Sequence, residues 1–215
     1  MRQFADASMA LAYLLAKKDI LGSKYAREVI EPLNPLERVS ESGFLRELAW
    51  VILCGGIAES VIRKVFPAIT ESFLGWHSAE EIAERASECI DSANIHFHHE
   101  KKIKAIVSSA RIVHVRSFSV VHDEILQDPL GSLMKFPFIG PTTVFHLAKN
   151  IGVRVAKPDR HLTRLASASG FDDVQIFCGR IAVFLSEDIR KVDSVLWRFA
   201  TIHPDYIERF TSYAL

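Results

Sequence analysis

Apolar residues recur three and four positions apart along almost the whole chain, which is the spacing of an amphipathic helix. Residues 94–99 are polar and predict a turn, and residues 113–121 are the one stretch that also fits an isolated extended strand. No internal repeat or low-complexity tract is present. The pattern therefore predicts an all-α fold. Helices are expected at residues 7–18, 44–54, 58–66, 78–90, 101–114, 119–127, 142–150, 159–169, 172–185 and 191–202, with a short helix after Asp128.

Several of these expected helices are bounded by residues that favour helix ends. Ser78 begins a capping box, and the stretch from Ser40 to Ser42 is placed to cap the helix expected from about Phe44. Asp128 stands before a proline, as an N-cap residue does when proline occupies the first turn. Gly152 and Gly170 are expected to end two of the helices.

Composition and charge limit the class of protein. The 215 residues suit one compact domain or two small lobes, and 49% hydrophobic residues are enough for a full core. Lys plus Arg equals Asp plus Glu, 26 against 26, which argues against a nonspecific polyanion binder. A local basic face stays possible, because phosphate binding depends on where the charge lies.

The few, widely spaced cysteines fit a reducing compartment. Cys54, Cys89 and Cys178 are far apart and form no CxxC pair, so we expect free thiols rather than a disulfide framework. Three cysteines also exclude a four-cysteine iron–sulfur site built from this chain alone. We see no signal peptide and no apolar run near the roughly 20 residues that span a bilayer. We therefore expect a cytoplasmic protein.

Residues 133–150 have the pattern of two short helices joined by a tight turn. The turn contains Pro137 and Gly140, and Pro141 is expected at the first position of the second helix. In such a hairpin the free amide N–H groups and the positive end of the second helix point outward, where they bind a phosphate oxygen without reading sequence. An ordinary turn punctuated by proline and glycine is the alternative interpretation.

A carboxylate follows this hairpin. Asp159 lies nineteen residues after Gly140, at the start of the helix expected over residues 159–169. Aspartate in that place usually caps the helix. Near a phosphate-binding turn it has a second use, because an ionised carboxylate orients water or faces the positive charge that develops on a deoxyribose as its base departs.

These two segments resemble those of the helix-hairpin-helix DNA glycosylases, the HhH-GPD superfamily that includes endonuclease III. The family's hairpin has the form Leu-Pro-Gly-Val/Ile-Gly-x-x-Thr-Ala, where this chain has Phe136-Pro137-Phe138-Ile139-Gly140-Pro141-Thr142-Thr143-Val144. The family's invariant Asp lies further on in a Val-Asp-Thr-His-x-x-Arg segment, where this chain has Lys157-Pro158-Asp159-Arg160-His161-Leu162-Thr163-Arg164. The resemblance covers residues 44–164 and is specific for this pair of segments.

The resemblance implies a two-lobed helical fold with Asp159 in a cleft between the lobes. One lobe would be residues 41–152, with the hairpin at residues 133–150, and the other would be residues 1–40 with 153–215. It also implies a monofunctional enzyme of base excision repair, which flips a damaged, mispaired or modified base out of double-stranded DNA and hydrolyses its N-glycosidic bond. We expect no cofactor, no metal and no membrane contact, and a monomer associated with the nucleoid.

Candidate site residues follow from the same resemblance. Asp159 is the expected catalytic carboxylate, and the base pocket is expected to include Trp50, Cys54, Gly55 and His161. Core packing is the alternative role for Trp50 and His161. Contacts to DNA are expected from Lys135, Phe138, Gly140, Thr142, Thr143, Arg160 and Arg164.

The chain departs from the family pattern at three places. Phe138 replaces the first hairpin glycine, and Thr142 stands where the lyase members have their Schiff-base lysine. The iron–sulfur cysteines of endonuclease III are absent, as in many relatives. The threonine predicts a glycosylase that uses water rather than an amine nucleophile.

Three other functions stay open on the sequence alone. One is a bifunctional glycosylase/lyase whose lysine has moved to Lys135, Lys149 or Lys157. Another is a DNA-binding protein that keeps the hairpin without the chemistry. The last is a helical interaction protein with no DNA role.

Some residues outside the two segments also have candidate roles. His96, His98 and His99 are close together, but their alternation favours a solvated or DNA-facing loop over a metal site. Lys101, Lys102 and Lys104 form either a basic patch or a solvated helix face. Asp193, in a helix expected to serve lobe packing, is a candidate contact to the active-site region.

Overall fold

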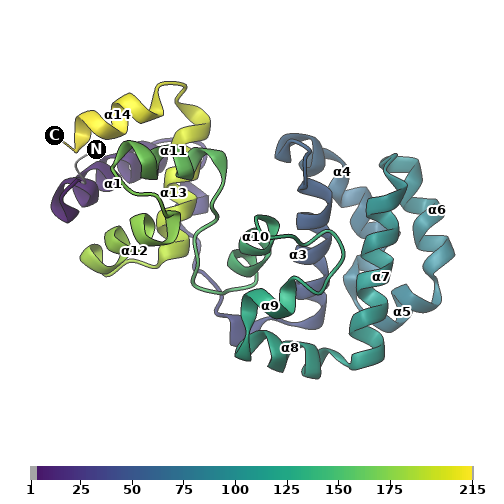
Figure 1. Ribbon diagram of the computed structural model, residues 1–215. Helices are drawn as coiled ribbons and strands as arrows, with labels where there is room; N and C mark the ends of the chain where they lie inside the picture. The colour runs from purple at the N-terminus through teal and green to yellow at the C-terminus, as the bar shows by residue number, and fades with distance from the viewer. Residues whose placement is uncertain (1–3, 215) are drawn as a thin grey trace. The chain divides into compact units, whose positions relative to one another are not determined.

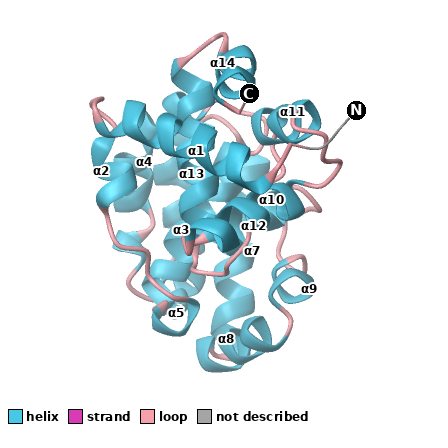
Figure 2. Cartoon of the chain, turned by 90° about the vertical axis from the view of Figure 1, so that its left-hand side faces the viewer, coloured by secondary structure: helices cyan, strands magenta, loops and turns pink. Residues whose placement is uncertain are grey.

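The computed structural model describes residues 4–214, and the regular elements in that range are all helical (Figure 1). Figure 2 shows these helices joined by loops, with no strand in the described part of the chain. The all-α prediction is therefore confirmed. The extended alternative for residues 113–121 is wrong, since these residues belong to two helices and the short link between them. Among the described residues, no helix has both the length and the apolar character needed to cross a membrane.

The chain forms two compact units. One, which we call the continuous unit, is Asn34–Val153. The other, the discontinuous unit, combines the residues up to Leu33 with those from Arg154 onward. From the sequence we expect the boundaries between the units after residues 40 and 152, and the structure has them after residues 33 and 153.

The discontinuous unit is held together by apolar side chains from both of its chain segments. α1 contacts α12, α13 and α14, and Tyr13 of α1 is buried with Phe177, Phe199 and Phe210 from the later helices. Full burial of one large apolar side chain is worth about 1.5–3 kcal/mol. Its helices are α1 (Asp6–Leu21), α2 (Ala26–Ile30), α11 (Arg160–Ala168), α12 (Val174–Leu185), α13 (Ile189–Ile202) and α14 (Tyr206–Tyr213).

The continuous unit is arranged around one long helix. α7 (Glu100–Arg116) contacts α3, α5, α6 and α8, and α10 contacts α3 and α9. The other elements are the 3-10 helices η1 (Leu36–Arg38) and η2 (Leu74–Trp76), α3 (Glu41–Cys54), α4 (Glu59–Ser72), α5 (Ala79–Glu84), α6 (Ala86–His96), α8 (Phe118–Gln127), α9 (Pro129–Leu133) and α10 (Thr143–Asn150).

The helix starts predicted from capping residues are confirmed. The side-chain oxygens of Ser40, Ser78 and Asp128 each accept a hydrogen bond from a backbone N–H three residues later, at 3.1–3.3 Å. Such bonds satisfy amide groups that the first helical turn leaves without intrahelical partners. Gly152, expected to follow a helix, lies just beyond α10 with φ +110°, a conformation that glycine adopts freely.

Several helix boundaries differ from the sequence-based prediction, among them the start of α3, which is at Glu41 rather than at residue 44. The helix expected over residues 78–90 is two helices, because the backbone departs from helical angles at Arg85 (φ −96°, ψ 28°). The second of these continues through His96, so the turn predicted from residue 94 begins only at Phe97. α4 continues through Pro67 to Ser72, because buried Phe66 and Ile69 hold both sides of the proline in the core.

Candidate nucleic-acid interface and catalytic carboxylate

The turn between α9 and α10 is built on two buried side chains and one exposed ring. Phe136 and Ile139 are buried in the continuous unit, whereas the ring of Phe138 between them is 48% exposed. α10 begins at Thr143, so the prediction that Pro141 is its first residue is wrong. The Oγ1 of Thr143 accepts the N–H of Gly140 at 2.7 Å, and this bond closes the turn before the helix starts.

The amide groups at this turn differ in their availability. The N–H of Gly140 is bonded to Thr143, as described above. Among the described residues, the N–H groups of Thr142 and Thr143 make no hydrogen bond. They lie at the N-terminus of α10, where the helix dipole favours an anion. The amide groups that the turn leaves available to an anion are therefore those of Thr142 and Thr143 rather than that of Gly140.

Phe138 has an unusual backbone. Its φ is +63°, in the left-handed region that glycine adopts freely and other residues adopt at a cost of about 1–2 kcal/mol. This is the position at which the resembling family has its first hairpin glycine. The turn thus combines a left-handed backbone conformation with an exposed aromatic side chain.

The positive charge beside this turn is paired. The ammonium group of Lys135 lies 3.1 Å from Glu124 Oε2, and Arg116 pairs with the same carboxylate. A hydrogen bond from Lys135, followed by the effects of Arg116, lowers the pKa of Glu124. Lys135 would therefore exchange an existing ion pair for any DNA contact, which reduces the gain from that contact.

Asp159 lies at the N-terminus of α11, as the sequence predicts. Its Oδ1 accepts hydrogen bonds from the N–H groups of His161 at 2.9 Å and Leu162 at 3.0 Å. Its Oδ2 accepts none within the part of the chain that the structure describes. The side chain is half-buried. One oxygen therefore fixes the orientation of the carboxylate, and the other has no hydrogen-bond partner among the described residues.

Two side chains hold the irregular segment that leads to Asp159. Asp193 of α13 accepts the N–H of Lys157 at 2.5 Å, so the hypothesis that Asp193 contacts this region is confirmed. Gln175 of α12 accepts the N–H of Ala156 at 2.9 Å, and its own amide donates to the Ala156 carbonyl. The sequence analysis missed Gln175, because one glutamine on an otherwise ordinary helix gives no local signal.

The other candidates on α11 surround Asp159. Arg160 and Arg164 are exposed and lie four residues apart, on the same side of the helix. His161 packs edge-on against Tyr206, with ring centroids 5.4 Å apart, and its Nδ1 is buried without a partner among the described residues. Burial lowers the pKa of His161, so its neutral form is favoured.

The expected pocket residues Trp50, Cys54 and Gly55 lie at the C-terminal end of α3. Trp50 is half-buried and meets Phe66 edge-on, with ring centroids 5.0 Å apart. This contact is the packing that we gave as the alternative role for Trp50. Cys54 is the last residue of the helix, and its half-buried thiol is not part of a disulfide.

Lys102 explains why α3 ends here. The residue is 3% exposed, and its ammonium group donates to the carbonyls of Leu53 at 2.6 Å and Gly55 at 2.5 Å. A cation on the last carbonyls satisfies groups that the helix end leaves without partners. Lys102 therefore belongs neither to a basic patch nor to a solvated face. Lys102 stands at helical spacing from Ile106 and Ser109, which are both buried, and this spacing indicates that it lies on the apolar side of α7.

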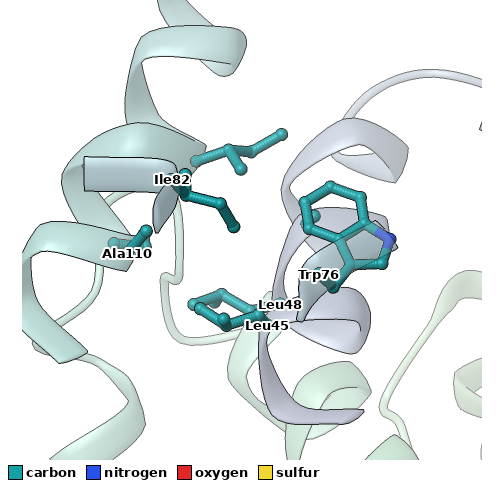
Figure 3. A pocket seen from close by; sticks show the side chains of 8 residues that line it. Leu45, Leu48, Trp76, Ile82 and Ala110 are labelled. Atoms are coloured by element: carbon teal, nitrogen blue, oxygen red, sulfur yellow. The ribbon is translucent and has the colours of Figure 1, made fainter. Parts of the chain in front are cut away.

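A small cavity in the continuous unit is not the expected base pocket. Its lining is almost entirely apolar, and the labelled side chains Leu45, Leu48, Trp76, Ile82 and Ala110 face one another across it (Figure 3). It is too tight for a water molecule. None of the pocket residues predicted from the sequence lines it, so it is a packing defect of the core.

No protein-family model matches the chain, and no curated protein matches it.

A proposal about the chemistry of this protein thus depends on the arrangement of its own side chains. In residues 4–214 no three His, Cys, Asp or Glu side chains are grouped so as to hold a metal ion. The continuous unit contains the hairpin and the α3 end. The discontinuous unit contains Asp159, Arg160, His161 and Arg164. Each unit therefore carries one set of candidates, a turn with two unbonded N–H groups in the first and an oriented carboxylate in the second.

Proposed function

We propose that the protein is a monofunctional DNA glycosylase, which hydrolyses the N-glycosidic bond of a damaged, mispaired or modified base in double-stranded DNA. The observation that carries this proposal is the half-engaged carboxylate of Asp159, with Oδ1 held by two backbone N–H groups and Oδ2 free of hydrogen bonds within the described residues. We further propose the finer architecture of the helix-hairpin-helix glycosylases, in which two lobes flank a cleft, and action as a monomer.

The chemistry requires one water molecule and no group beyond the chain. The target nucleotide is flipped out of the duplex, because its glycosidic bond cannot be reached inside the stack. As the C1′–N bond breaks, the base leaves with the bonding electrons and the sugar gains oxocarbenium character. The carboxylate of Asp159 stabilises this positive charge and orients the water whose oxygen bonds to C1′. The proton released by that water is taken up by the base or by solvent.

The DNA backbone is gripped at two places in this proposal. The free N–H groups of Thr142 and Thr143 receive a phosphate oxygen at the start of α10. The exposed side chains of Arg160 and Arg164 neutralise phosphates near the flipped nucleotide. Contacts of this kind position the duplex without reading its sequence, and they weaken as salt is added.

The test is base release by Asp159→Asn from a panel of duplexes that carry different lesions and natural modifications. Asparagine caps helices about as well as aspartate, so the fold should survive the substitution. Loss of the charge should slow base release by about 10³-fold, within the usual range for a positioned acid–base group. The dissociation constant for duplex DNA should change little.

A matched control is available in the same unit. Asp173 caps α12 by accepting the N–H of Ile176 at 2.9 Å, and it is exposed. Asp173→Asn makes the same chemical change at an equivalent helix start and should leave base release unchanged. Equal base release by Asp159→Asn and the wild type would refute the role of Asp159.

Borohydride treatment during turnover separates the monofunctional enzyme from one that uses a relocated lysine. A lysine nucleophile forms a Schiff base with the sugar, which borohydride reduces to a stable covalent adduct. We expect no adduct from the wild-type protein, because Thr142 stands at the lysine position of the resembling lyases. Duplex binding without base release from any member of the panel would instead mark a non-catalytic DNA-binding protein.

A further inference from the structure

We infer that Gln175 and Asp193 are positioning residues, which act through the backbone of residues 156–159 to fix the carboxylate of Asp159. The inference rests on the proposed function, since it assigns these two side chains to the same reaction. Each lies on a different helix of the discontinuous unit, Gln175 on α12 and Asp193 on α13.

Gln175 binds the backbone of Ala156 in two directions. Its Oε1 accepts the Ala156 N–H at 2.9 Å, and its Nε2 donates to the Ala156 carbonyl. This paired arrangement resembles the two bonds that a neighbouring strand would make. It fixes both the position and the rotation of a peptide segment that has no regular structure of its own. The Ala156 side chain is fully buried, which anchors the same residue from its other side.

Asp193 binds the next residue. Its Oδ2 accepts the N–H of Lys157 at 2.5 Å, and the side chain is 1% exposed. A hydrogen bond to an ionised acceptor is shorter and stronger than one between neutral groups. A carboxylate buried to this extent is costly unless it is well bonded, and the N–H of Lys157 is one of the groups that bond it.

The path from these two residues reaches Asp159 through successive hydrogen bonds. The carbonyl of Lys157 accepts the N–H of Asp159 at 2.8 Å, and Asp159 then bonds to His161 and Leu162 through Oδ1. Pro158, between the two, has its φ fixed by its ring. Hydrogen bonds therefore restrain the residues on either side of Pro158, and the conformational freedom left to Asp159 is small. Displacement of a catalytic group by about 1 Å can cost about 10²-fold in rate.

The experiment measures single-turnover base release and duplex binding for Gln175→Ala and Asp193→Ala, with the folded fraction checked by circular dichroism. We expect the rate to fall by about 10-fold for Gln175→Ala and up to about 10²-fold for Asp193→Ala, with the dissociation constant for DNA unchanged. A merely structural role would lower the folded fraction rather than the rate of the folded protein. Asp193→Asn, which keeps an oxygen for the Lys157 N–H, should recover most of the rate and serves if Asp193→Ala does not fold.

Neighbouring residues on the same helices provide the controls. Ser194→Ala removes a hydroxyl that donates to the Arg190 carbonyl of its own helix, and Ile176→Ala truncates a side chain that is 57% exposed. Both should keep the wild-type rate. In the Asp159→Asn background, Gln175→Ala should cause no further loss, because two changes that act through one group are not additive.

The outcomes separate this inference from the proposed function. Wild-type rates for folded Gln175→Ala and Asp193→Ala, in a protein that releases a base, overturn the inference and leave the function in place. If the wild type releases no base, the function fails, and amide hydrogen exchange at His161 and Leu162 decides the structural part. Faster exchange in Gln175→Ala than in the wild type supports the inference that Gln175 restrains the segment that leads to Asp159. Unchanged exchange overturns that inference.

Discussion

Phe138 offers a test of the hairpin backbone that does not depend on any activity. The residue has φ +63°, where an L-amino acid loses about 1–2 kcal/mol relative to the right-handed region and glycine loses nothing. Glycine in turn gives up about 0.5–1 kcal/mol more backbone entropy on folding than alanine. The difference predicts that Phe138→Gly is more stable than Phe138→Ala by about 1 kcal/mol. At most positions of a protein the order of these two variants is the reverse.

The assay is urea unfolding of both variants, and Met134 provides the matched control. Met134 is in the same turn and is 45% exposed, but its backbone is ordinary, with φ −66° and ψ −10°. There alanine should be more stable than glycine by about 0.5–1 kcal/mol. If Phe138→Ala equals or exceeds Phe138→Gly in stability, the left-handed conformation of the turn is refuted.

The same two variants separate the backbone from the ring in DNA binding. Both lack the half-exposed aromatic side chain, so a contact between that ring and the sugar–phosphate backbone would be lost equally from both. We therefore expect their duplex affinities to fall together while their stabilities differ. Wild-type affinity in both variants would show that the ring contributes nothing to binding.

Two further predictions concern buried ionisable groups. Burial, followed by the charge of Glu187 and a hydrogen bond to it, raises the pKa of Tyr13 well above the usual value, so only the unfolded state loses this proton as the pH rises past about 10. The free energy of unfolding should then fall by about 1.4 kcal/mol per pH unit from this group, and the difference between wild type and Tyr13→Phe, measured by urea unfolding from pH 9 to 11, should show it. A pH-independent difference would contradict the raised pKa. Lys102→Met removes the ammonium group that donates to the carbonyls of Leu53 and Gly55, so it should lower the free energy of unfolding by about 2–4 kcal/mol in urea unfolding. Lys101→Met, at an exposed position, should lower it by under about 0.5 kcal/mol. Equal stability of the two variants would refute the role of Lys102 at the helix end.

Local chemistry made much of the fold predictable. The helical spacing of apolar residues identified most of the helices, and Ser40, Ser78, Asp128 and Asp159 marked their starts, because a capping bond involves residues only two or three positions apart. α14 was missed. It is short, and tertiary burial of Tyr206 and Phe210 rather than local preference holds it.

Long-range contacts explain what the sequence did not reveal about the candidate site. Asp159 was predictable because its cap is local, but the bonds from Gln175 and Asp193 join segments that are 19 and 36 positions apart. Lys102 was assigned to the surface because it is charged, although its place on the apolar side of α7 was already visible in the spacing. The carbonyls that it binds are 47 and 49 positions away, and no local pattern points to them.

The interleaved order of the two units has a consequence for synthesis on the ribosome. Asn34–Val153 contains every element of the continuous unit, so that core can close once this stretch has emerged. α1 must wait, because Met9, Tyr13 and Ile20 are buried against helices that begin only at Arg160. At about 5–20 residues per second, the nascent α1 exposes its apolar side for on the order of ten seconds, the period in which a chaperone or another nascent chain would meet it.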